Sequence, residues 1–319
     1  MKKLVLLSLL IPIFSACSDD ECGSGNVSVL ELVSPKLFAD LPIDNPMTGA
    51  LSVYPCLENS SVYFGNYNKD GALSPIQGFY VTQNGFADVG GPAVRLPVGT
   101  YNMVYWGLPV VTTPTYDSPA VVDPPVPIGW DLSTLYYGLR KHSTVSDTTY
   151  YPTHDYALAV APVNIGSEDL KAALQRKSSA INVIVQNKDN SAFAANISSM
   201  WVHLGGISEK INFYTGEPTN VYRTVEFPLL SSENNTKRIS NTVFVFPSSP
   251  SPLFQLFIQL NNNQVKVYRQ KLSEALVAGS KLTLTLTLNE VMSEENEVGE
   301  FTVNDWTENT EAIEVPPLF

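Results

Sequence analysis

The sequence contains few of the residues that build metal and catalytic sites. It has 3 cysteines and 3 histidines in 319 residues. The histidines, His142, His154 and His203, are far apart, and no Cys-x-x-Cys or His-x-x-x-His spacing occurs, so we expect no metal site. The Gly-x-Ser-x-Gly and Gly-x-Gly-x-x-Gly motifs are also missing. We therefore expect no cofactor and no enzymatic activity.

Positive charge is scarce as well. Lys and Arg number 19 against 31 Asp and Glu, which gives a net charge of -12. An acidic chain repels phosphate, which argues against nucleic acid and anionic lipid headgroups as partners. Hydrophobic residues make up 44% of the chain, so it can form packed cores, and its length allows two domains. Beyond the N-terminus no apolar run is long enough to span a bilayer.

The N-terminus carries the most specific local pattern. Lys2 and Lys3 precede an apolar stretch, Leu4–Phe14, which has the length of a signal-peptide core and is too short for a membrane span. Small residues then lead to Cys17, and the acidic run Asp19–Glu21 follows shortly after. These features predict a signal peptide over residues 1–16.

This arrangement resembles a bacterial lipoprotein signal. The resemblance implies cleavage before Cys17 and acylation of its thiol, as by palmitate, and more than one acyl chain gives stable membrane anchoring. The acidic run resembles the surface-export tag of Bacteroidetes lipoproteins, which implies a surface-exposed lipoprotein of the cell outer membrane. The alternative is an ordinary secretory signal in which the cysteine occurs by chance.

Two cysteines remain if Cys17 carries lipid. Cys22 and Cys56 can form a disulfide in an oxidising compartment. The bridge would tie the acidic tether, residues 17–26, to the first domain and stabilise the fold by about 3 to 4 kcal/mol. The alternative is a pair of free thiols that never meet.

Alternating apolar residues predict many β-strands. The pattern occurs in Ile181–Val185, Phe254–Leu260 and Leu282–Leu288, where one face of each strand is apolar. Val243–Phe246 is continuously apolar, as expected of a central strand. Asn261–Asn263 predicts a hairpin turn after the second of these strands. Many short strands separated by turns favour an all-β fold of sandwich domains.

Two segments have helical spacing instead. Leu132, Leu135, Tyr136 and Leu139 follow Asp131, which suits an N-cap. Ser167–Leu174 is a weaker second helix. A polar stretch near residues 162 to 177 predicts a domain boundary, so we expect an N-terminal β-sandwich domain over residues 27–165 and a C-terminal one over residues 166–319.

Four phrases resemble the fimbrillin-type proteins of Bacteroidetes, the subunits of lipoprotein-derived fimbriae. They are the Gly-x-Tyr turn and strand in Leu96–Gly107, the segment Leu174–Val185, the strand Ala278–Leu288 and the terminal Phe301–Trp306. The resemblance covers the whole chain. It implies two tandem transthyretin-like Greek-key sandwiches and a role as a fimbrial subunit in pilus assembly and cell adhesion.

The family also implies assembly by β-strand complementation with other fimbrial subunits. In such fimbriae an arginine-specific protease removes the first strand, and a neighbour's strand fills the groove. Val27–Val33 would be that strand here. No arginine lies between Cys17 and Arg95, and Arg95 directly precedes a predicted strand. The chain therefore resembles an anchor or accessory subunit more than a stalk subunit, with host or bacterial surface receptors as further partners.

Other hypotheses concern particular segments. A glycan-binding lipoprotein of a polysaccharide-uptake system would share the signal and the sandwiches. It would use aromatic residues of the segment 130–156, which otherwise cover the core of the first domain. The tail Glu308–Phe319 either inserts into a partner or docks on its own domain. His203 shares strand parity with Trp201, and we expect both on a half-exposed face.

Overall fold

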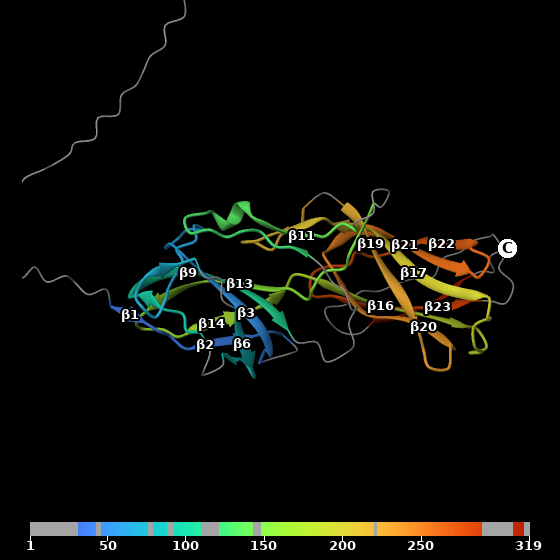
Figure 1. Cartoon of the computed structure of the whole chain (residues 1–319), viewed down its shortest axis with the longest axis horizontal. Helices are drawn as coiled ribbons and strands as arrows, with labels where there is room; N and C mark the ends of the chain where they lie inside the picture. Colours follow the sequence, from blue (N-terminus) through green and yellow to red (C-terminus); the bar gives the residue numbers. More distant parts are fainter. Residues whose placement is uncertain are drawn as a thin grey trace, which may run out of the picture. The chain divides into compact units, whose positions relative to one another are not determined.

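The structure is a computed structural model. It describes residues 31–42, 46–75, 79–87, 92–109, 121–142, 148–219 and 222–288, and the backbone of residues 309–315. From Leu32 onward the chain forms one compact unit. The fold is all-β, as predicted, and the described residues contain a single short 3-10 helix and no α-helix. In Figure 1 most of the blue to green strands form one group and most of the yellow to red strands form another.

The first group forms an eight-stranded sheet in the order β14-β2-β7-β6-β3-β9-β13-β15. Its strands are β2 (Leu37–Asp40), β3 (Gly49–Cys56), β6 (Phe79–Gln83), β7 (Phe86–Ala87), β9 (Gly99–Pro109), β13 (Ala157–Ile165), β14 (Leu170–Ala173) and β15 (Gln175–Arg176). The longest, β9, pairs antiparallel with β3 on one side and with β13 on the other. It corresponds to the strand predicted in Leu96–Gly107.

Successive residues of β9 face two different cores. Met103 and Tyr105 pack into a smaller core with side chains of β2, β3 and β14. Val104 and Trp106 point to the other face and belong to a larger core. Because β14 also contacts β13, the sheet curls around the smaller core. Both faces of its central strands are therefore buried.

The second group is a sandwich of nine hydrogen-bonded strands in the order β22-β21-β17-β19-β20-β16-β23-β24, with β12 attached to β19. Its strands are β12 (Thr149–Tyr150), β16 (Ser179–Asn187), β17 (Ile197–Ser208), β19 (Tyr222–Ser231), β20 (Lys237–Val245), β21 (Ser248–Leu260), β22 (Val265–Lys271), β23 (Lys281–Leu288) and β24 (Asn309–Val315). Strand β19 pairs with β17 along most of its length and with β20 at Leu230 and Ser231. It thereby joins two layers whose inner side chains form the larger core.

The predicted strands of this region are confirmed. Ile181–Val185 lies in β16, Phe254–Leu260 in β21 and Leu282–Leu288 in β23. The continuously apolar Val243–Phe246 is buried at the end of β20, where its first three residues pair with β16. The predicted turn at Asn261–Asn263 connects β21 to β22.

The two predicted helices are mostly wrong. Asp131 does act as an N-cap, accepting from Ser133 N at 2.9 Å, but only the 3-10 turn η1 (Leu132–Thr134) follows. The chain then continues as β11 (Tyr136–Leu139), which pairs with β10 (Val121–Val122) and β18 (Lys210–Asn212). Strand pairing buries Tyr137 and Leu139, and this tertiary gain outweighs the helical spacing of the segment.

The second helical candidate, Ser167–Leu174, contains strand β14, which runs parallel to β2. Its alternating burial, with Leu170 and Ala172 inside, matches a strand once a partner is available. Strands β14 and β15 both follow residue 165 and belong to the first sheet. The chain passes to the second group of strands between Arg176 and Ser179.

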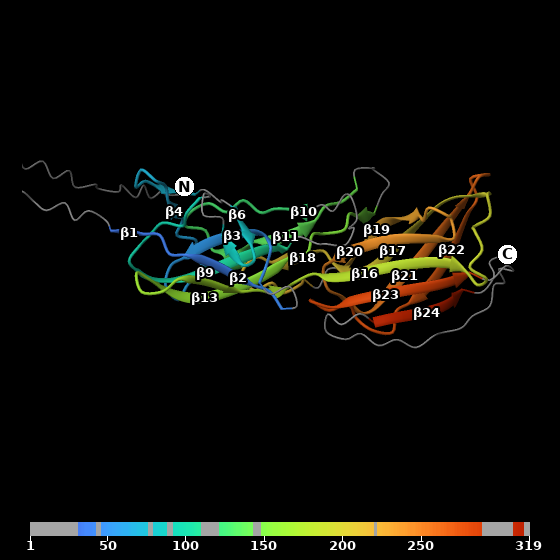
Figure 2. The ribbon, with the colours of Figure 1, turned by 90° about the horizontal axis from the view of Figure 1, so that it is seen from below.

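Both ends of the chain extend beyond the described residues. The signal peptide over residues 1–16, the tether over residues 17–26 and the phrase Phe301–Trp306 lie outside them. Of the predicted first strand, Val27–Val33, residues 31–33 are described, and they contain β1 (Leu32–Val33), which pairs with β8 (Leu96–Pro97). Two further short strands, β4 (Asn66–Tyr67) and β5 (Leu73–Ser74), pair with each other. Strand β24 runs parallel to β23 at the edge of its own sandwich (Figure 2), so this part of the tail docks on its own domain.

Candidate functional site

The structure describes one of the three cysteines that were predicted as modification sites. Cys17 and Cys22 lie outside the described residues. Cys56 ends β3 and is completely buried, with its Sγ 3.7 Å from the carbonyl oxygen of Tyr54. Burial, ahead of the charge of Asp131, raises the pKa of the Cys56 thiol to about 12. The thiol is therefore neutral and unreactive at physiological pH, and its bridge to Cys22 stays a prediction.

The aromatic segment 130–156 divides between surface and core. Trp130 and Tyr136 are 48% and 41% exposed, whereas Tyr137 and Tyr156 are buried. The two buried rings stack at 4.7 Å between centroids and meet Trp106 edge to face at 4.8 and 5.7 Å. For Tyr137 and Tyr156 the interpretation as core residues is thus confirmed.

This aromatic cluster joins the two groups of strands. Phe213 directly follows β18, which the chain forms between β17 and β19 of the sandwich. Its ring lies 5.7 Å from that of Trp106 on β9, and Trp106 Nε1 donates a hydrogen bond to Phe213 O at 2.9 Å. Tyr156 of the same cluster lies 6.4 Å from the ring of Phe246, which directly follows β20 of the sandwich. The larger core contains residues of both groups, so the two groups share one core.

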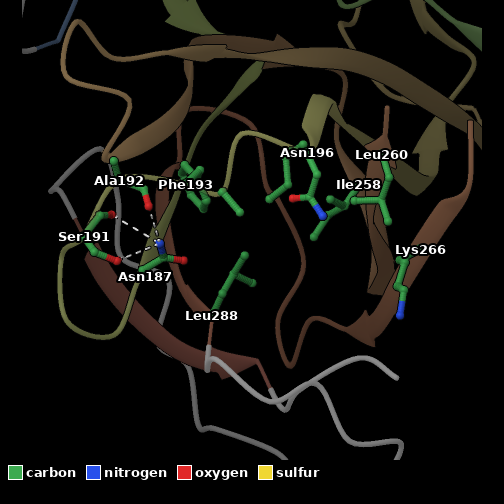
Figure 3. A pocket seen from close by; sticks show the side chains of 11 residues that line it. Asn187, Ser191, Ala192, Phe193, Asn196, Ile258, Leu260, Lys266 and Leu288 are labelled. Atoms are coloured by element: carbon green, nitrogen blue, oxygen red, sulfur yellow. Dashed lines mark hydrogen bonds between the residues drawn. The ribbon is translucent and has the colours of Figure 1, made fainter. Parts of the chain in front are cut away.

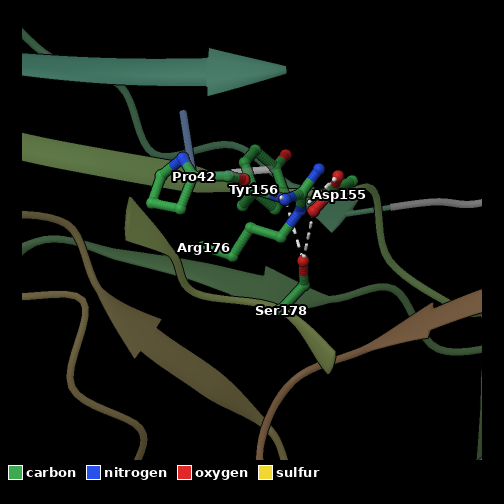
Figure 4. Close-up of polar contacts among 5 residues, drawn as sticks. All are labelled: Pro42, Asp155, Tyr156, Arg176 and Ser178. Carbon is green, nitrogen blue, oxygen red and sulfur yellow. Dashed lines mark hydrogen bonds and ion pairs between the residues drawn. The ribbon is translucent and has the colours of Figure 1, made fainter. Parts of the chain in front are cut away.

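A buried ion pair reinforces the same junction (Figure 4). Arg176 Nε donates to Asp155 Oδ2 at 3.0 Å, and the two side chains are 6% and 3% exposed. Arg176 Nη1 also donates to Pro42 O at 3.2 Å. Ser178 Oγ donates to Asp155 Oδ1 at 2.9 Å and accepts from Tyr156 N at 3.1 Å. The connection between the two sheets is therefore held at both ends by buried polar contacts.

A second polar contact lies on the outer face of β17. His203 and Trp201 are half-buried there, as predicted, while Val202 and Leu204 point inward. Glu226 Oε2 lies 2.9 Å from His203 Nε2 and accepts from Thr149 Oγ1 at 3.1 Å. Thr149 belongs to β12, so this carboxylate bonds β12 to the outer face of the sandwich.

The Glu226 contact predicts a pH dependence. The hydrogen bond from His203, ahead of that from Thr149, holds the pKa of Glu226 below its ordinary value, although burial opposes it. Since the folded pKa is lower than the unfolded one, the stabilisation is present above the ordinary carboxyl range and is lost as pH falls through the folded pKa. We expect Glu226→Gln to cost about 1 kcal/mol at neutral pH and nothing in strong acid. Urea unfolding across acidic to neutral pH measures this difference, and the exposed Glu58→Gln is the control. A cost that is equally large in strong acid contradicts the assignment.

One edge of the sandwich is open in the described part of the chain. Strand β22 ends the strand order and pairs only with β21. Leu260 N donates to Gln264 O at 2.8 Å and Leu272 N to Pro252 O at 2.9 Å. Ladder bonds recur at every second residue of an antiparallel pair. The backbone N–H and C=O groups of four residues therefore point away from β21, namely those of Val265, Val267, Arg269 and Lys271.

A cavity opens between the two layers next to this edge (Figure 3). Its volume is about 440 Å³. Its apolar lining comes from both layers, with Leu288 from one and Ile258 and Leu260 from the other, and Phe193 between them. Lys266 of β22 lines it as well. On the opposite side Asn187 Nδ2 donates to Ser191 O at 3.2 Å and to Ala192 O at 3.2 Å, which shapes the wall.

The described residues contain neither a metal site nor a membrane-spanning helix. Among them, no group of three or more His, Cys, Asp or Glu side chains is placed to hold a metal ion. No helix within the described ranges is long and apolar enough to cross a membrane.

Comparisons with solved structures find several similar proteins. A candidate cell adhesion protein from Bacteroides uniformis is 18% identical, with 86% of this chain and 99% of that chain covered and a TM-score of 0.47. A candidate adhesin from Bacteroides ovatus is 10% identical, with 82% and 88% covered and a TM-score of 0.44. The fimbrial anchor protein Mfa2 from Porphyromonas gingivalis is 12% identical, with 76% and 83% covered and a TM-score of 0.40.

The family assignment comes from the sequence. A search of curated proteins finds no match. The profile of the fimbrillin-A associated anchor proteins Mfa1 and Mfa2 matches residues 43–312, which include nearly all strands of both groups. The fimbrillin-type resemblance in the sequence is therefore confirmed, and with it an association with fimbriae and adhesion. This chain belongs to the family of fimbrillin-A associated anchor proteins.

Proposed function

We propose that this protein is a surface-exposed lipoprotein of the outer membrane and acts as a fimbrial anchor or accessory subunit. The match of residues 43–312 to the anchor family carries this proposal. The acylated Cys17 would hold the chain to the membrane, and other fimbrial subunits would join it by β-strand complementation. Its work is mechanical and adhesive, and it catalyses no reaction.

The position of the first arginine supports an anchor rather than a released subunit. No arginine separates Cys17 from Arg95. Arg95 is half-buried, its N donates to Asn66 Oδ1 at 2.7 Å, and its O accepts from Tyr67 N at 3.0 Å. A protease needs an extended, accessible backbone, which these bonds withhold at Arg95. Without a cut before Arg95, the chain keeps Cys17 and its lipid.

The junction between the sheets also suits an anchor. A fimbria transmits pulling force to its base. If the two domains of the base were loosely linked, the linker between them would stretch before the base opposed the force. Here Trp106 and Phe213 share one core, and Arg176 with Asp155 locks the connecting chain. Force applied to the sandwich therefore reaches the N-terminal sheet through packed contacts as well as through the backbone.

Replacing Cys17 tests the lipid anchor. We expect Cys17→Ala to move nearly all of the protein from the membrane to the soluble fraction, because acyl chains supply the binding energy. Fractionation of cells with immunoblotting measures this. Cys22→Ala is the matched control and should stay membrane-bound. Mass analysis of the mature N-terminus should find acyl groups on Cys17, and co-isolation should recover other fimbrial subunits. Full membrane retention of Cys17→Ala refutes the anchor.

A second candidate function is glycan binding, and one observation favours it. The exposed Tyr136 lines a shallow depression of about 280 Å³ together with Asn212, Glu217 and Thr219. An aromatic face beside amide, carboxylate and hydroxyl groups is suited to a sugar ring. Binding of the purified protein to a glycan panel, lost in Tyr136→Ala, would support a glycan-binding lipoprotein of a polysaccharide-uptake system.

A further inference from the structure

We propose that the edge of β22 and the cavity beside it form a docking site for an extended, acidic segment of a neighbouring subunit. The segment would add to β22 as a strand and place an apolar side chain in the cavity. This inference rests on the proposed function, because it names the surface and the chemistry through which such a partner binds.

The backbone supplies the first argument. Four successive odd-numbered residues of β22, from Val265 to Lys271, direct their N–H and C=O groups away from β21. An incoming strand satisfies these groups with ladder bonds, which is how sheet edges capture extended peptides. Among the described residues, the opposite end of the sandwich differs, since β24 already covers β23 there.

Charge supplies the second argument. Strands β21 and β22 contain Lys266, Arg269 and Lys271 and no acidic residue, in a chain whose net charge is -12. Arg269 and Lys271 are exposed and lie on the outer face, whereas Lys266 lines the cavity. Like charges prevent two β22 edges from pairing with each other. The charges of Arg269 and Lys271 attract a strand that carries carboxylates, so the edge selects an acidic partner over a second copy of itself.

The cavity supplies the third argument. In the β21–β22 pair Lys266 lies opposite Ile258, on the side of the sheet that faces the cavity. A strand added beyond β22 alternates its side chains between the two faces, so one of them lies over this opening. The cavity of about 440 Å³, lined by Leu288, Ile258 and Leu260 as well as by polar groups, accommodates a large apolar side chain. Backbone pairing would then give affinity, and the cavity would give register.

A designed peptide tests the site directly. The probe is a fluorescent peptide of sequence Glu-Val-Glu-Leu-Glu-Val-Glu, titrated into the full chain and followed by anisotropy. We expect this peptide to bind with an affinity about tenfold higher than that of the same peptide with Lys in place of Glu. We also expect the affinity to fall as the salt concentration rises. A version N-methylated at alternate residues keeps the charges but cannot complete the ladder, and it should lose binding.

Variants of the protein isolate the edge. The N–H of Val267 points away from β21, so Val267→Pro removes an edge donor without breaking the existing pair. We expect it to weaken peptide binding about tenfold, while the matched Val267→Thr binds normally. Ala194→Trp, at the exposed mouth of the cavity, should weaken binding and leave the thermal melting temperature unchanged. Far-ultraviolet circular dichroism checks that each variant is folded.

Several results would overturn the proposal. Absence of peptide binding would mean that the basic residues merely protect the edge from pairing. Binding that is insensitive to Val267→Pro and to N-methylation would place the peptide elsewhere. Binding that appears only after the acidic residues of the segment 289–308 are neutralised would mean that the chain itself occupies the edge. If any of these results is obtained while Cys17→Ala still releases the protein from the membrane and other fimbrial subunits still co-isolate with it, this docking site is refuted. The proposed function then stands.

Discussion

Trp106→Ala should lower the free energy of unfolding by about 3 to 5 kcal/mol, the cost of truncating a buried tryptophan. Trp106 is 2% exposed and contacts Tyr137, Tyr156 and Phe213 at the junction of the two groups of strands. The substitution also leaves Phe213 O without its donor. Because Trp106 belongs to the core that contains residues of both groups, we expect urea unfolding to change from one transition to two.

Two further variants test whether the effect is specific to the buried Trp106 ring and its hydrogen bond. Trp106→Phe keeps an aromatic ring but removes the Nε1 donor, so its cost should be smaller, about 1 to 3 kcal/mol. Trp130→Ala is the matched control, because Trp130 is 48% exposed, and its effect should stay within about 0.5 kcal/mol. If Trp106→Ala costs no more than Trp130→Ala, the shared core does not couple the two groups of strands.

Asp155→Ala should be comparably destabilising, by about 3 to 5 kcal/mol, because it leaves Arg176 as a buried charge without its carboxylate. It also removes the acceptor of Ser178 Oγ. The large cost comes from a buried guanidinium that has lost the Asp155 carboxylate, so Asp155→Leu combined with Arg176→Met should be much less harmful than either single substitution. Chemical unfolding of the four proteins forms a double-mutant cycle that measures this coupling.

Proteolysis gives an independent measurement of the same ion pair. Arg176 is the last residue of the first sheet, and its side chain is 6% exposed. An arginine-specific protease should spare it in the native protein and cut after it in Asp155→Ala, once the connection loosens. The exposed pair of Lys69 and Asp70, with N and O 3.6 Å apart, provides the control. Asp70→Ala should alter neither stability nor cleavage, and equal behaviour of the two variants would refute the role of Asp155.

The fold class was predictable because its cause is local. Alternation of apolar and polar residues in Phe254–Leu260 and Leu282–Leu288 suits a two-faced strand whatever its neighbours are. The lipoprotein-like N-terminus and the fimbrillin-type phrases are likewise read from contiguous residues. The exposure of His203 and the hairpin after Leu260 followed from strand parity and turn chemistry. These features need no knowledge of distant contacts.

The wrong helix prediction for residues 132–139 shows that a local pattern does not always determine the secondary structure. The spacing of Leu132, Leu135 and Leu139 fits one face of a helix, but the same residues also fit a 3-10 turn followed by a strand. What decided between them is the pairing of β11 with β18, whose residues lie about seventy positions later in the chain. The strand β14 was missed for the same reason, since its parallel partner β2 comes from the start of the domain.

By itself, therefore, the sequence determined that the chain is an all-β member of a fimbrial family, and it predicts a signal for lipid attachment, because periodicity and contiguous motifs are local properties. Only the tertiary structure decided which residues act together. Trp106 and Phe213 are 107 residues apart and Asp155 and Arg176 are 21 apart, and no spacing rule connects them. The open edge that β22 forms within the described residues was also beyond prediction, because an edge is defined by the absence of a neighbouring strand.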